Sequence, residues 1–170
     1  MIITNINDIK FYREFNLCKT EDLKNIKEVI DLEFAKGNIV WTHPLYQTYN
    51  DLHKRLKHVL SFNKLKNIVI KLVRDINKDL RLTTCWTNLS AENNAYAFHS
   101  HNTKLTCVFY LQSKQDCYGL RLKKPEIIFP SIENSIIIFD GSVSHSIEYI
   151  PNKVFDSVDS HRYSVVFDFN

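Results

Sequence analysis

The chain has 170 residues, of which 44% are hydrophobic and 24% are charged, with only three glycines and four prolines. This length can bury a sizeable core, and the scarcity of glycine and proline excludes collagen-like and low-complexity proteins. A formal net charge of only +3 excludes the strongly basic surface of a dedicated nucleic-acid binder. We expect one domain over residues 1–170, without a linker or an internal repeat.

The sequence predicts a cytoplasmic protein without a membrane-spanning segment. Its longest strongly apolar run, residues 135–139, is far too short to cross a bilayer. Residues 1–5 lack the basic and apolar regions of a secretory signal. The cysteines form no Cys-x-x-Cys pair, so we predict free thiols rather than disulfides or a zinc site. They are Cys18, Cys85, Cys107 and Cys117.

Residues 1–80 predict a strand followed by helices. Residues 6–15 alternate loosely between apolar and polar side chains, which is typical of a strand. Apolar residues three and four apart then predict an amphipathic helix over 21–36. We expect Thr20 to cap its N-terminus and Gly37 to end it in a left-handed conformation.

A loop over residues 38–50 is expected next, followed by two further helices. The apolar spacing places the second helix over residues 52–60 and the third over residues 65–80. Lysine and arginine side chains in this region fall mostly off the apolar stripe. We interpret them as a solvated helix face rather than a phosphate-binding stripe.

From residue 81 onward the pattern changes to short β-rich runs separated by turn residues, with no helix between them. The predicted strands cover residues 81–88, 95–101, 104–112, 118–123, 126–129, 135–140, 144–150 and 161–169. Such a series predicts a sandwich or barrel rather than a parallel α/β sheet. We expect a mainly β, α+β protein in which residues 81–170 form the β core and the helices of residues 1–80 pack on one of its sheets.

Three histidines are candidate metal ligands. His99 and His101 lie at i and i+2 on an extended segment and therefore point to the same face, and His145 arrives from a later predicted strand. Imidazole suits Fe, Zn, Cu and Ni, and three protein ligands leave positions open for a substrate, whereas a structural zinc site needs four. The alternative is that each histidine is an isolated surface or core residue without a metal. The other four histidines lack such neighbours, and we predict structural or exposed positions for His43, His53, His58 and His161.

An anion-binding pair is predicted on the last strand. Arg162 and Ser164 lie at i and i+2, so a guanidinium and a hydroxyl face the same way, which suits one carboxylate. An arginine inside a barrel is costly unless it meets an anion. The alternative is an arginine at the rim that pairs with Asp159 or Asp168.

The order of these motifs resembles the iron(II)- and 2-oxoglutarate-dependent oxygenases, and more narrowly a family of them that is frequent in bacteria and their phages. The resemblance covers residues 81–170. It rests on Trp86-Thr87-Asn88, His99-Ser100-His101-Asn102, the runs 105–111 and 136–139, Pro125, His145 and the run 162–167. It implies a double-stranded β-helix, or jelly-roll, with helices supporting its major sheet.

The resemblance also implies roles for individual residues. His99, His101 and His145 would hold Fe(II), with His101 at the position where the superfamily carries a carboxylate. Arg162 would bind the far carboxylate of 2-oxoglutarate with help from Ser164, and Tyr110 is a second candidate contact. O2 would be the other co-substrate. An organic substrate, a small molecule or a peptide rather than a nucleic acid, would be hydroxylated with release of succinate and CO2.

Two other functions stay open at this point. Three imidazoles contribute no negative charge, which suits a three-histidine cupin-type dioxygenase that does not use 2-oxoglutarate, although the Arg-x-Ser strand suits that class less well. An oxygenase of the first kind would need a compensating acid, for which Asp140 and Glu148 are close in the sequence. A non-enzymatic jelly-roll of phage origin is the third alternative. Asn88 and Trp86 are further candidates for the pocket wall, although for Trp86 we favour a position in the core.

Overall fold

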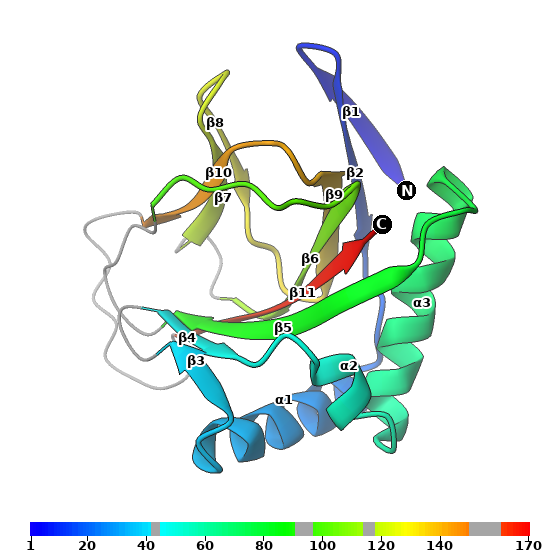
Figure 1. Ribbon diagram of the computed structural model, residues 1–170, viewed down its shortest axis with the longest axis vertical. Helices are drawn as coiled ribbons and strands as arrows, with labels where there is room; N and C mark the ends of the chain where they lie inside the picture. The colour runs from blue at the N-terminus through cyan, green and yellow to red at the C-terminus, as the bar shows by residue number, and fades with distance from the viewer. Residues whose placement is uncertain (42–44, 91–96, 114–117, 150–160) are drawn as a thin grey trace.

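The computed structural model describes residues 1–41, 45–90, 97–113, 118–149 and 161–170, and it consists of two antiparallel sheets with helices on the outer side of the larger one (Figure 1). The helices are α1 (Thr20–Ala35), α2 (Leu52–Arg55) and α3 (Leu60–Ile76). The strands are β1 (Ile2–Ile6), β2 (Ile9–Phe15), β3 (Ile39–Trp41), β4 (Leu45–Thr48), β5 (Leu82–Ser90), β6 (Leu105–Gln112), β7 (Tyr118–Leu122), β8 (Ile127–Pro130), β9 (Ser135–Asp140), β10 (His145–Tyr149) and β11 (Arg162–Phe169).

The two sheets have the crossing strand order of a jelly-roll. The larger sheet runs β1-β2-β9-β6-β11-β5-β4-β3 and the smaller one runs β10-β7-β8. Neighbours in the larger sheet such as β9 and β6 are far apart in sequence, and all the pairings are antiparallel. Side chains of both sheets meet in an inner apolar cluster that includes Phe11, Phe139, Leu120 and Phe129. The predicted architecture, a β core supported by helices on its major sheet, is confirmed.

Strand β11 lies in the middle of the larger sheet and is buried on both faces. Its odd-numbered residues, such as Val165 and Phe167, join the core that the sheet shares with the helices. Its even-numbered residues face the space between the two sheets. Because side chains alternate along a strand, one strand builds the core with one face and presents polar groups to the interior with the other.

The helices cover the outer face of the larger sheet through apolar residues at helical spacing. On α3 these are Phe62, Leu65, Val69 and Val73, all of them fully buried. The ring of Phe62 stacks on Phe167 of β11 with 6.4 Å between centroids. Full burial of such a side chain stabilises the fold by roughly 1.5–3 kcal/mol. The shared core of helices and sheet that the sequence predicts is therefore present.

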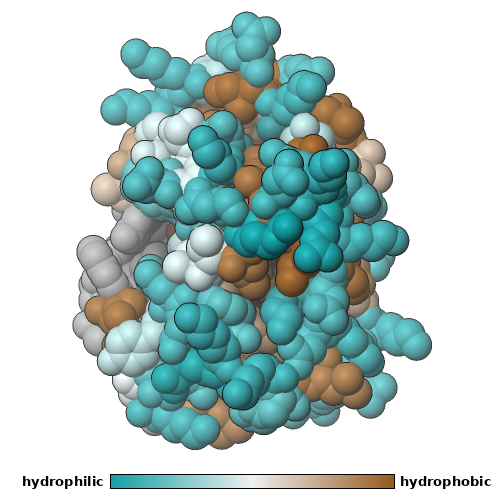
Figure 2. Space-filling model, turned by 45° about the vertical axis from the view of Figure 1, so that its right-hand side comes forward, coloured by the Kyte–Doolittle hydropathy of each residue, from teal (hydrophilic) through white to brown (hydrophobic). Residues whose placement is uncertain are grey.

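The other side of α3 faces solvent, as the charge pattern predicts. Lys64, Lys71 and Arg74 are exposed, and Lys64 forms an ion pair with Asp22 of α1 at 2.9 Å. Figure 2 shows this side of the molecule, where hydrophilic residues cover most of the surface. None of the described helices is long and apolar enough to span a membrane.

The N-terminal elements differ from the prediction in two places. The strand expected over residues 6–15 is a hairpin of β1 and β2, with Asn7 and Asp8 at φ values of 47° and 65° in its turn. Two consecutive positive φ angles are typical of a type I′ hairpin turn, which favours asparagine and aspartate. Lys19, not Thr20, is the N-cap of α1, whereas Gly37 does adopt the expected left-handed conformation, with φ of 73°.

The region between α1 and α3 also differs. The loop expected over residues 38–50 contains β3 and β4, and β4 extends the larger sheet by pairing with β5. The helix expected over residues 52–60 ends at Arg55, and α3 begins at Leu60 rather than at residue 65. The apolar spacing is shared by two successive helices, so periodicity alone did not reveal the turn between them.

The later strands agree with the prediction except for residues 95–101. Residues 95 and 96 lie outside the described part of the chain, and residues 97–101 form no strand but make an isolated antiparallel bridge from His99 to His145. Of the cysteines, Cys117 lies outside the described residues. The other three are free thiols, as predicted, namely Cys18, Cys85 and Cys107.

Candidate metal centre

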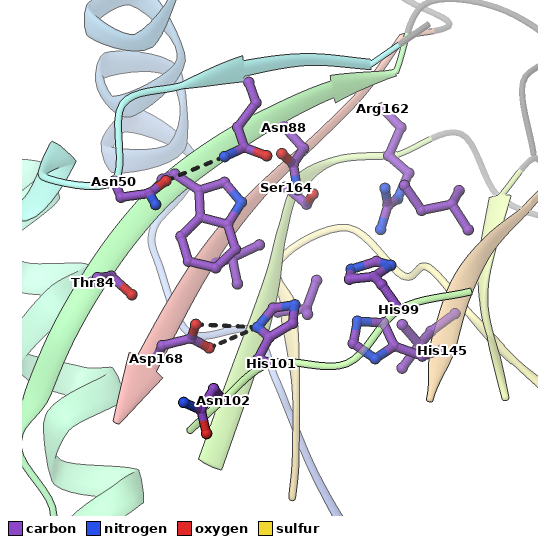
Figure 3. Close-up of a pocket in the computed structure, with 16 residues that line it drawn as sticks. Asn50, Thr84, Asn88, His99, His101, Asn102, His145, Arg162, Ser164 and Asp168 are labelled. Carbon is purple, nitrogen blue, oxygen red and sulfur yellow. Dashed lines mark hydrogen bonds and ion pairs between the residues drawn. The ribbon is translucent and has the colours of Figure 1, made fainter. Parts of the chain in front are cut away.

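A cavity of about 260 Å³ lies between the two sheets, and all three candidate histidines line it. Figure 3 shows their rings gathered at one side of this cavity, with Arg162 pointing toward them from β11. The inward residues of β11 form one wall, and Leu120 and Ile147 of the smaller sheet contribute apolar surface opposite. The cavity therefore combines a cluster of imidazoles, a cation and apolar walls.

The backbone fixes the three histidines in place. His99 and His145 exchange two backbone hydrogen bonds, of 2.9 and 2.8 Å, and the amide of His101 donates to the carbonyl oxygen of Gly141 at 2.7 Å. A Cβ on Gly141 would lie 2.4 Å from the backbone oxygen of Thr103, so only glycine allows the chain to approach this closely. Each histidine offers one ring nitrogen, and these atoms all lie within 4.8 Å of one another.

Two of the rings are oriented by backbone carbonyl groups. His145 Nδ1 donates to the oxygen of Val143 at 2.8 Å, and His99 Nδ1 donates to that of Ala97 at 3.1 Å. In a neutral ring that is protonated at Nδ1, Nε2 carries the lone pair that can bind a metal. Burial lowers the pKa of His145 to about 3 and lowers that of His99 as well. Both rings are therefore neutral at pH 7, as metal ligands must be.

His101 is oriented differently, by a carboxylate. Its Nδ1 lies 2.9 and 3.1 Å from the two carboxylate oxygens of Asp168, as the dashed lines in Figure 3 show. Thr106 Oγ1 donates to Asp168 Oδ1 at 2.8 Å. A carboxylate can only accept, so Nδ1 carries the proton and Nε2 is again left as the possible ligand.

Asp168 is the site residue that the sequence analysis missed, because it considered this aspartate only as a partner for Arg162. The two residues are six positions apart on one strand, which separates their backbones by about 20 Å. Asp140 accepts hydrogen bonds from the backbone and hydroxyl of Ser142 instead of reaching a histidine. The side chain of Glu148 and the whole of Asp159 lie outside the described residues.

Arg162 and Ser164 face the same cavity, as their i, i+2 spacing predicts. Arg162 is 2% and Ser164 1% exposed, and Ser164 Oγ is a buried atom for which no described residue provides a hydrogen bond. The guanidinium carbon of Arg162 lies 5.0 Å from the centre of the Tyr110 ring. Tyr110 is not among the described residues that line the cavity, and it belongs to the inner apolar cluster.

The mouth of the cavity is polar but carries few charges. Asn88 and Trp86 line it, and Trp86 also belongs to the inner apolar cluster, whereas Asn88 Oδ1 is buried without a hydrogen-bond partner among the described residues. Gln47 and Asn50 line it too, and Gln47 donates to Asn50 at 3.2 Å. Their contribution could not be predicted, because it depends on β4 pairing with β5.

The remaining histidines stay away from this cluster. His53 is half-buried within α2, His58 is exposed, and His161 precedes β11. His43 lies outside the described residues. Among the described residues, the group of His99, His101 and His145 is the only one of its kind with metal-binding geometry.

Several solved oxygenases have a similar structure. A prolyl hydroxylase from Trichoplax adhaerens, in complex with a hypoxia inducible factor oxygen degradation domain peptide fragment, gives a TM-score of 0.69 at 13% identity over 94% of this chain and 82% of that chain. The non-heme alpha ketoglutarate dependent epimerase SnoN from nogalamycin biosynthesis gives 0.73 at 12% identity over 94% and 77%. HygX from Streptomyces hygroscopicus, with nickel and 2-oxoglutarate bound, gives 0.68 at 10% identity over 94% and 81%.

These similarities identify the fold as the double-stranded β-helix of 2-oxoglutarate oxygenases, which confirms that prediction. No protein-family model and no curated protein matches the chain. The similar structures include hydroxylases and an epimerase, so the fold alone does not select one reaction. Any function for this chain has to be argued from its own site.

Proposed function

We propose that this protein is an iron(II)- and 2-oxoglutarate-dependent oxygenase that hydroxylates an organic substrate and releases succinate and CO2. The observation that supports the proposal best is that three histidine nitrogens within 4.8 Å of one another share a cavity with the buried Arg162. A group of three candidate metal ligands alone would fit many kinds of protein. Three such ligands beside a buried guanidinium fit a site that binds a metal together with an anion.

The donor set suits the metal. Three imidazoles, each offering one ring nitrogen, form one face of a coordination sphere and leave the remaining positions open for co-substrate and O2. Iron(II) bound there with 2-oxoglutarate would supply the chemistry that oxidises an unactivated C–H bond. The protein holds the ligands rigidly, through the paired backbones of His99 and His145.

The other end of the cavity suits a diacid. Arg162 brings a buried positive charge and five donors, which match a carboxylate in a two-pronged geometry. Ser164 Oγ, buried and without a described partner, adds one more donor on the same face of β11. Val108, Val166 and Leu120 line the cavity nearby, so they exclude water from the reacting groups.

We favour a small molecule or a peptide as substrate. The mouth of the cavity presents the amides of Gln47, Asn50 and Asn88, which bind uncharged polar groups. Exposed lysine and arginine side chains lie on α3, on the far side of the larger sheet (Figure 1). A nucleic acid would need such charges around the cavity.

The test is ligand-induced stabilisation without oxygen. Fe(II) should raise the melting temperature, and 2-oxoglutarate should raise it further, because both bind only the folded state. Arg162→Lys keeps the positive charge but loses the bidentate hydrogen-bonding geometry of the guanidinium. It should therefore abolish the increase in melting temperature from 2-oxoglutarate and retain the increase from Fe(II). Arg74→Ala, which changes an exposed arginine of α3, is the matched control. An unchanged melting temperature with both ligands would rule the proposal out.

A three-histidine dioxygenase that does not use 2-oxoglutarate is the second candidate, because all three metal donors are neutral imidazoles. Release of succinate separates the two, since only a 2-oxoglutarate oxygenase converts that co-substrate. A purified protein with neither iron nor another transition metal, and no affinity for one, would instead point to the non-enzymatic jelly-roll.

A further inference from the structure

We propose that Asp168 is a positioning residue which supplies, through His101, the negative charge that the three imidazoles do not provide. The inference rests on the metal site proposed above and assigns a role to a residue behind it. His101 lies between the carboxylate and the cavity, with Nδ1 at 2.9 and 3.1 Å from the Asp168 oxygens. Asp168 therefore acts on a bound metal through the ring and not as a ligand.

The carboxylate is buried and is held in place by His101 and Thr106. Asp168 is 4% exposed, and burying a carboxylate is costly unless it is paired and hydrogen-bonded. In the described part of the chain its ion pair is with His101 alone. The buried hydroxyl of Thr106 donates to its Oδ1 at 2.8 Å. Thr106 lies directly opposite Asp168 in the pairing of β6 with β11, so the sheet itself sets this contact.

The charge balance at the metal explains why such a residue is needed. A face of two histidines and one carboxylate, the usual one for non-haem iron, neutralises one of the two positive charges. Three neutral imidazoles neutralise none, and the cavity is partly enclosed by apolar walls. Asp168 restores the missing charge about one ring-width further away. It also makes the His101 ring a stronger donor, because hydrogen bonding to Nδ1–H raises the basicity of Nε2.

His101 differs from the other two histidines in this respect. His99 and His145 donate their Nδ1 protons to backbone carbonyl groups of Ala97 and Val143. A neutral carbonyl orients a ring but adds no charge. The carboxylate that the described residues supply thus lies behind His101, the ligand at the position where a carboxylate is missing.

The first test compares metal affinities of the full chain by calorimetric titration, with Ni(II) in air and Fe(II) without oxygen. Asp168→Asn keeps the size of the side chain and removes its charge, and it should weaken binding of both ions by about 10–100-fold. Asp79→Asn removes one charge from an exposed turn and should leave both affinities within twofold. Equal affinities of Asp168→Asn and the unchanged protein would overturn the inference.

The second test asks whether the charge acts through the ring. In His101→Ala the ring that links Asp168 to the cavity is absent, so adding Asp168→Asn should change Ni(II) affinity much less than it does in the unchanged background. A loss of equal size in both backgrounds would mean that the two positions are not coupled and would refute the proposed path through His101.

A milder variant covers the case in which Asp168→Asn does not fold. Thr106→Val has nearly the same shape and removes only the hydroxyl that donates to the carboxylate. It should weaken Ni(II) binding in the same direction by a few-fold, and unchanged affinity would count against the inference. If the unchanged protein itself binds neither ion, the metal site proposed above is wrong. If it binds them and the variants bind equally well, only the role of Asp168 is wrong.

Discussion

The two faces of β11 differ sharply in polarity. The face toward the helices carries Tyr163, Val165, Phe167 and Phe169, and it packs as a continuous apolar core. The face toward the cavity carries three polar or charged residues, all buried. An apolar face stabilises the fold, whereas burying polar or charged groups carries a desolvation cost that their partners have to offset. The comparison teaches that the inner face is kept for binding and not for stability.

The largest expected effect comes from the core face. Phe167→Ala removes a fully buried ring that stacks on Phe62. Such truncations cost about 3–5 kcal/mol, and this one should lower the free energy of unfolding by that amount in denaturant titrations. Metal affinity of the remaining folded protein should stay unchanged, since the ring points away from the cavity. A large loss of metal affinity at full folding would show that the two faces are not separable.

An intermediate effect is expected on the cavity face, and on binding instead of stability. Ser164→Ala removes a buried hydroxyl for which no described residue provides a hydrogen bond, so the free energy of unfolding should change little or rise. Hydrogen bonds to charged groups contribute roughly 1.5–3 kcal/mol. The dissociation constant for 2-oxoglutarate should therefore increase about tenfold or more in titrations of the iron-loaded protein. A destabilised variant with unchanged affinity would reverse this assignment.

The smallest effect concerns pH and the metal-free protein. Burial lowers the pKa of His145 to about 3, whereas the unfolded chain titrates near 6.5. Between these values the unfolded state binds more protons, so stability is complete above pH 6.5 and decreases as the pH falls toward 3. From pH 6.5 to 5.5 one such group costs about 1 kcal/mol. Urea titrations in chelator should show this slope, and His145→Asn should reduce it.

The strand pattern predicted most of the site because the relevant alternation is local. The i, i+2 relation of Arg162 and Ser164 needs no knowledge of neighbouring strands, and the same holds for His99 and His101. The cluster of His145 with the other two was inferred from motif order. The extended segment expected around His99 is only an isolated bridge, yet it leaves the two side chains in one cavity.

Asp168 shows where local patterns stop being informative. Arg162 and this aspartate are six positions apart on one strand, so the alternation of side chains already places the aspartate in the interior. That part of its role can be inferred from the sequence. Its two partners cannot be inferred in this way. Thr106 lies opposite Asp168 because β11 pairs with β6, and His101 reaches it because of the path that residues 97–101 take. Both depend on long-range register, which a single sequence does not encode in any short motif.

The N-terminal hairpin was missed for a different reason. Two-residue hairpin turns are usually signalled by glycine in the second position, and here Asn7-Asp8 forms the turn without any glycine. The strand pair β3–β4 was missed because Trp41 and the residues beside it read as a loop. In both cases the sheet is wider than predicted, while the central strands that carry the site are as expected.

The paired backbones of His99 and His145 have one further consequence. The β-bridge between them joins residues 97–101 to β10, the edge strand of the smaller sheet. An ion bound by both rings would cross-link two residues that are 46 positions apart, and closing so long a loop carries a large entropic cost. Metal binding would therefore stabilise the closed edge of the jelly-roll, where two backbone hydrogen bonds join His99 to His145 and a third joins His101 to Gly141.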